Sequence, residues 1–145
     1  MKKILLYFFI VFFSVFYLQA QTTEGTEFWL TFGGWNIPNP LSNPYDMQIR
    51  IVCGSQPTTV TIHFTNLDTY FSTNISAYEV YTYTLDNTQR VAMYNMGTGK
   101  SNYSAHITTT KPVSVYALQS LTVSRTDVTN LLPVTALNSR SLRSL

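Results

Sequence analysis

The chain has 145 residues, a formal net charge of +2 and a charged fraction of 11%. This composition excludes acidic and basic disordered tails, and 6 Gly and 6 Pro are too few for a collagen-like or proline-rich chain. Hydrophobic residues make up 45% of the sequence, which favours one folded domain.

The first predicted element is a signal peptide helix over residues 1–20. Met1-Lys2-Lys3 is basic, residues 4–18 carry no charge, and Ala20 is a small residue at the expected cleavage point. The alternative is a membrane anchor, but this uncharged run is shorter than the roughly 20 residues that a spanning helix needs. We therefore expect a secreted or cell-surface protein with no stable membrane span after cleavage.

Removal of the signal peptide makes the exported chain neutral. Loss of Lys2 and Lys3 leaves 7 cationic residues against 7 anionic ones. The remaining Lys and Arg are scattered singly, whereas a phosphate backbone is held by clustered cations. The sequence therefore argues against a nucleic-acid partner.

Residues 21–137 are predicted to form one all-β domain. Apolar and polar residues alternate with period two, and β-branched and aromatic residues fill the runs. The predicted strands cover residues 28–32, 47–51, 60–64, 71–75, 80–85, 91–94, 103–107 and 113–117. About eight short strands favour an antiparallel β-sandwich, with the second and third paired as a hairpin through Gly54-Ser-Gln-Pro57.

One long loop stands out as a candidate binding segment. Residues 33–45 hold three Pro and show no periodicity, and Trp35 and Tyr45 lie near its ends. Long loops at the rim of a sandwich often carry binding residues, and aromatic side chains dominate interface energetics. Trp29, Trp35 and Tyr45 are therefore the candidate protein-binding surface.

The residues that could carry chemistry favour structural roles. Cys53 is the only cysteine, so we expect a thiol buried at a strand end, with a reactive thiol or an intermolecular bridge as alternatives. His63 and His106 lie on the polar side of their strands, so both are expected to face solvent. Because these three residues have no recognised ligand spacing, we predict no metal site, cofactor or catalytic residue.

Paired carboxylates suggest one enzymatic alternative. Glu24 and Glu27 are three residues apart, and a carbohydrate-active enzyme needs two carboxylates in one cleft. Glu24 lies in the start of the exported chain, however, and Glu27 directly precedes a strand, so we do not expect an enzyme. Asn74-Ile-Ser76 and Asn102-Tyr-Ser104 match the N-glycosylation pattern and are read as hints of surface loops.

Two segments resemble a known family. Glu24-Gly-Thr-Glu-Phe-Trp-Leu-Thr-Phe32 is similar to the opening of the IgGFc-binding protein N-terminal domain. Its closing pattern resembles Lys111-Pro-Val-Ser-Val-Tyr-Ala117, Thr126-Asp127 and Leu131-Leu-Pro-Val-Thr-Ala-Leu137, in the same order and separation. Asp127 corresponds to an Asp just before the last strand of family members, and the resemblance leaves open whether it has a turn or strand-entry role or contacts a ligand.

The resemblance implies a secreted or surface-displayed protein. Members occur in animal mucus and in bacteria, so the implied partner is a host or matrix glycoprotein, including immunoglobulin Fc or a mucin-like protein. The alternative is a structural N-terminal segment of a larger surface protein, with no ligand of its own. The similarity ends after Leu137, so we expect residues 138–145 to form an irregular tail of a truncated copy.

Overall fold

The computed structural model describes residues 22–33, 45–95, 100–121 and 125–137. The predicted signal peptide, residues 34–44 of the long loop and the predicted tail lie outside the described residues.

The all-β prediction is confirmed. The described residues form a seven-stranded antiparallel sheet of β1 (Gly25–Leu30), β3 (Tyr45–Cys53), β4 (Thr58–Phe64), β5 (Thr69–Ile75), β6 (Val80–Thr84), β8 (Ala105–Leu121) and β9 (Arg125–Leu131). A short parallel pair is formed by β2 (Phe32–Gly33) and β7 (Tyr94–Asn95).

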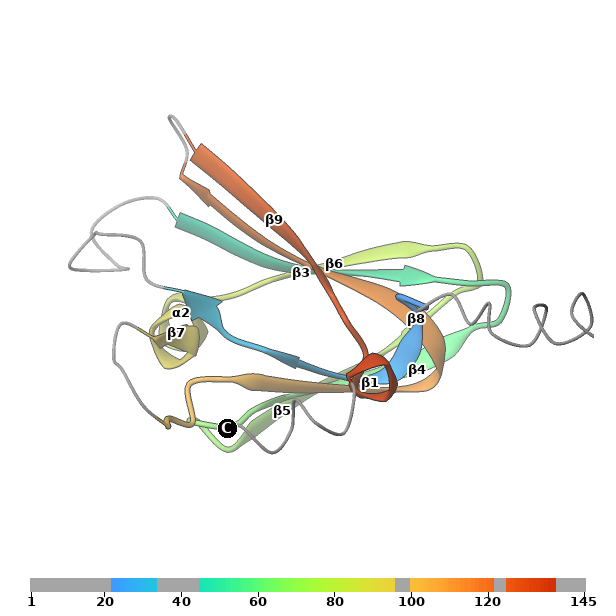
Figure 1. Ribbon diagram of the computed structural model, residues 1–145, viewed down its shortest axis with the longest axis horizontal. Coiled ribbons are helices and arrows are strands. Elements are labelled where there is room, and N and C mark those ends of the chain that lie inside the picture. The colour runs from blue at the N-terminus through green and yellow to red at the C-terminus, as the bar shows by residue number, and fades with distance from the viewer. Residues whose placement is uncertain (1–21, 34–44, 96–99, 122–124, 138–145) are drawn as a thin grey trace, which may run out of the picture.

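The 17-residue strand β8 organises the sheet. Its first part pairs with β4 and β1, and its second part pairs with β3 and β9. Pro112 lies between the β4 and β3 ladders, where its missing N–H removes no ladder hydrogen bond. Figure 1 shows β8 turning back on itself, so that two arms of one curled sheet replace the two separate sheets expected.

The predicted hairpin between residues 47–51 and 60–64 is wrong. In the described sheet β3 and β4 are not neighbours, because each pairs with a different part of β8. The connection makes its backbone hydrogen bonds to the β5–β6 connection instead. Cys53 N donates to Glu79 O over 3.0 Å, and Tyr78 N donates to Gly54 O over 2.8 Å. The chain therefore passes from one arm to the other at this corner.

The predicted strand over residues 91–94 is also wrong, because α2 (Asn87–Met93) occupies most of it. Asp86 caps this helix: its Oδ1 accepts from Gln89 N over 2.8 Å, while Gln89 Oε1 accepts from Asp86 N over 3.1 Å. This reciprocal capping box satisfies two backbone donors that a helix start leaves free. The segment directly before the predicted strand 91–94 is therefore a helix start.

The inner faces of both arms meet in one hydrophobic core. Phe28, Ile62 and Val115 are each 0% exposed, as the alternation predicts. Between β5 and β6, Phe71 packs against Tyr83 with ring centroids 4.5 Å apart. Cys53 is buried at the end of β3, and its thiol donates to Gln56 O over 3.0 Å, which confirms the predicted buried position.

Candidate functional site

Four aromatic side chains form a line across the outer face of one arm. The strand registers pair Trp29 with His106, His106 with His63, and His63 with Tyr70. The residues on either side of Trp29, His63 and His106 are buried, and Phe71 beside Tyr70 packs against the core, so the four rings share the opposite, outer face. We call Trp29, His106, His63 and Tyr70 the ring row. It spans β1, β8, β4 and β5, which lie side by side in the sheet.

Stacking holds the rings of the row in place. Trp29 and His106 stack with centroids 4.3 Å apart and planes at 13°. His63 and Tyr70 stack at 4.1 Å and 3°. The end rings are the accessible ones, because Trp29 is 50% exposed and Tyr70 is 67% exposed, whereas the histidine side chains are 26% and 23% exposed.

Each histidine is also bound to a carboxylate. His106 Nε2 lies 2.9 Å from Glu27 Oε1, and His63 Nε2 lies 3.1 Å from Asp68 Oδ1. These contacts fix both imidazole rings between an aromatic neighbour and an acid. The histidines were expected to face solvent; they lie on the outer face but are largely covered by these partners.

A polar row runs beside the ring row, one outward-facing position along each strand. Ser72 pairs with Thr61, Thr61 with Thr108, and Thr108 with Glu27. Thr61 Oγ1 and Ser72 Oγ are 3.3 Å apart. The outer face of this arm therefore presents aromatic edges next to hydroxyl and carboxylate groups.

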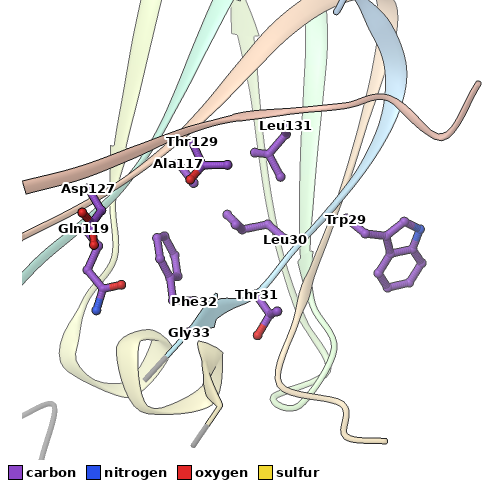
Figure 2. Close-up of a pocket in the computed structure, with 10 residues that line it drawn as sticks. All are labelled: Trp29, Leu30, Thr31, Phe32, Gly33, Ala117, Gln119, Asp127, Thr129 and Leu131. Carbon is purple, nitrogen blue, oxygen red and sulfur yellow. The ribbon is translucent and has the colours of Figure 1, made fainter. Parts of the chain in front are cut away.

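A cavity of about 450 Å³ lies where the two arms diverge, between β1 and β2 on one side and β8 and β9 on the other. We call it the cleft. Leu30, Phe32, Ala117 and Leu131 supply apolar walls, and Gln119, Asp127 and Thr129 supply polar groups. Figure 2 shows Gln119 and Asp127 close together at one end, while the Trp29 indole points away from the other labelled side chains.

Gln119 is the unusual residue of the cleft. It is 5% exposed, and its Nε2 has no hydrogen-bond partner among the described residues. Asp127 lies directly opposite on β9 in the strand register and is exposed. Asp127 was expected just before the last strand, but it lies inside β9, where its carboxylate borders the cleft.

The predicted binding surface is described only in part. Trp29 is exposed at one end of the ring row. Trp35 lies outside the described residues, and of Tyr45 only the backbone position at the start of β3 is described. Of the two possible glycosylation sites, Asn74 lies in strand β5 rather than in a loop, with its Oδ1 accepting from Thr59 Oγ1 over 2.7 Å.

Sequence reasoning missed Tyr70 and Gln119. The signal for Gln119 was available: it continues the buried positions Val113, Val115 and Ala117, where an amide is out of place. No comparable signal marked Tyr70, because its alignment with His63 depends on how β5 pairs with β4.

The described part of the chain lacks two further features. It contains no group of three or more His, Cys, Asp or Glu side chains arranged to hold a metal ion. None of its helices has the length and apolar character needed to cross a membrane.

Comparisons with models of known families, with curated proteins and with solved structures find no match to this chain. The resemblance to the IgGFc-binding protein N-terminal domain therefore stays a prediction that rests on the sequence segments quoted above.

Proposed function

We propose that this protein is an exported, non-enzymatic binding module that recognises a host or matrix glycoprotein through its ring row. The observation that carries the proposal is the alignment of four rings on one outer face, with Trp29 and Tyr70 exposed at its ends. Immunoglobulin Fc and mucin-like proteins are the first partners to test, since the family resemblance points to them.

The chemistry of the ring row suits a protein surface. Aromatic side chains bury large areas with little loss of conformational freedom, and they are enriched among the residues that dominate binding energy. A surface built on paired strands is also preorganised, so little conformational entropy is lost on binding. Stacking and the bonds to Glu27 and Asp68 restrain the two histidines further.

The neighbouring polar row would supply hydrogen bonds at the edge of such an interface. Interfaces combine an apolar centre with a polar rim. Thr61, Ser72 and Thr108 present hydroxyl groups beside the rings, and Glu27 adds an acceptor. Every residue that the proposed surface uses therefore lies in the described part of the chain.

The test is retention of immunoglobulin G, mucin and extracellular-matrix glycoproteins by the immobilised protein at micromolar concentration. Trp29→Ala and Tyr70→Ala should each weaken binding about tenfold or more, equivalent to about 1.4 kcal/mol. Their melting temperatures should stay close to that of the wild type, because both rings are at least half exposed.

Tyr78→Ala is the matched control. Tyr78 is 79% exposed but lies in the connection between β5 and β6, outside the ring row. Its loss should leave binding unchanged. If the wild-type protein retains none of the three kinds of glycoprotein, the proposal is wrong, and the structural-segment alternative becomes the better account.

A further inference from the structure

We infer that the cleft is a binding site for a neutral saccharide, such as the terminal sugar of a glycan. The inference rests on the proposed function in one respect, that the partner is a glycoprotein. Its two polar groups, Gln119 and Asp127, lie outside the ring row, and Trp29 is the one ring-row residue that also lines the described cleft.

The buried amide of Gln119 favours a bound ligand. An amide N–H₂ that is removed from water without a partner costs free energy, so nearly all such groups are bonded in folded proteins. Gln119 lines a cavity large enough for a ligand, and its buried Nε2 lacks a partner among the described residues. A ligand oxygen that accepts a hydrogen bond from Nε2 would satisfy it.

Asp127 adds a hydrogen-bond acceptor to the cleft. Gln119 and Asp127 oppose each other on neighbouring strands, and both line the cleft. A ligand must therefore accept at one atom and donate at a nearby one. Adjacent sugar hydroxyls do both, because each is a donor and an acceptor.

Anions, apolar molecules and simple ammonium groups suit Gln119 and Asp127 less well than a sugar does. Asp127 would repel an anion, and it carries the only charge among the residues that line the described cleft. An apolar ligand would leave the Gln119 amide unpaired, and a simple ammonium group offers donors but no acceptor.

The apolar walls of the cleft also suit a sugar. Leu30, Ala117 and Leu131 offer a surface for the C–H face of a sugar ring, and the volume of about 450 Å³ lies within the usual range of small-molecule sites. Thr129 adds a hydroxyl group on the same side as Asp127.

The inference is tested by titrating the full chain with neutral oligosaccharides that end in galactose, mannose or N-acetylglucosamine. Binding is followed by saturation-transfer NMR and calorimetry, with a sialylated oligosaccharide as the anionic probe. We expect one or more of the neutral sugars to bind and the sialylated one to bind at least tenfold more weakly. Gln119→Leu should weaken binding of the neutral sugar at least tenfold, and Asp127→Asn several-fold.

Gln119→Leu also separates a ligand role from a structural one. Leucine fills similar space and removes a buried amide without a partner, so its melting temperature should equal or exceed that of the wild type. Asp46→Asn, which neutralises an exposed carboxylate on β3 away from the cleft, is the control and should leave sugar binding unchanged.

The outcomes distinguish the two proposals. Retention of a glycoprotein that persists after its glycans are removed enzymatically, with no neutral sugar bound, would overturn the saccharide site and leave the ring-row proposal intact. Binding of a sialylated sugar or of a peptide in the cleft, in place of neutral sugars, would also overturn it. Failure to bind any glycoprotein or sugar would overturn both proposals.

Discussion

At the scale of single residues, Gly25 shows how close packing restricts the sequence. A Cβ atom at this position would overlap the Cβ atom of Pro133, which is part of a rigid ring in the segment after β9. Gly25→Ala should therefore lower the free energy of unfolding by about 1–3 kcal/mol, the usual cost of overpacking. Urea denaturation of the two proteins measures the difference.

Two further variants check that the cause is this contact. Gly54→Ala is the matched control, because nothing lies within 4 Å of the position of its added Cβ, and it should change stability by less than about 0.5 kcal/mol. In a Pro133→Gly background, Gly25→Ala should cost much less than in the wild type. Equal costs in both backgrounds would show that Pro133 is not the obstacle.

At the scale of elements, the short helix α2 depends on its first turn. It has 7 residues, too few for helical propensity alone to stabilise it, and Asp86 with Gln89 closes a capping box at its start. Asp86→Ala should destabilise the protein by about 0.5–2 kcal/mol, as for other N-cap residues. In thermal unfolding, the melting temperature of the Asp86→Ala variant should be a few degrees below that of the wild type.

Thr88→Ala is the comparison for this variant. Thr88 is exposed in the same turn and takes no part in the capping box, and alanine favours helix more than threonine does. It should therefore leave the melting temperature equal or slightly higher. If Asp86→Ala and Thr88→Ala behave alike, the capping box contributes little.

The same elements show what the sequence could and could not predict. Alternation correctly placed Phe28, Ile62 and Val115 in the core. In a strand with one buried face, every second side chain points to that face, so apolar residues recur at every second position. It could not show that β4 pairs with β8 instead of β3, since both pairings bury the same faces. Likewise α2 is too short to produce a helical stripe.

The candidate sites depend on the same missing information. The outward position of Trp29, His63 and His106 follows from alternation within each strand, but their alignment into one row requires the register between strands. The cleft requires still more, because it arises where β1 and β9, far apart in the sequence, border one cavity. Only Gln119 carried a local signal, as an amide at a buried position.

At the scale of the whole molecule, the buried Tyr94 and the half-buried Tyr81 couple folding to alkaline pH. Burial raises the pKa of Tyr94, which is 8% exposed. Burial, and then the neighbouring Tyr83, raises the pKa of Tyr81. In the unfolded chain a tyrosine ionises near pH 10, so the folded state keeps these protons to higher pH than the unfolded state does.

This difference has a definite sign. The contribution of both tyrosines to stability is fully present below about pH 10 and is lost as the pH rises through their raised pKa values in the folded state. The free energy of unfolding, measured in urea from pH 8 to pH 11.5, should therefore fall above about pH 10. Tyr94→Phe should make this fall shallower, because phenylalanine has no proton to lose. The free energy of unfolding of the Tyr94→Phe variant at pH 8 separately measures what the neutral hydroxyl group contributes to stability. If the free energy of unfolding of this variant falls above pH 10 as steeply as that of the wild type, Tyr94 is excluded as a cause.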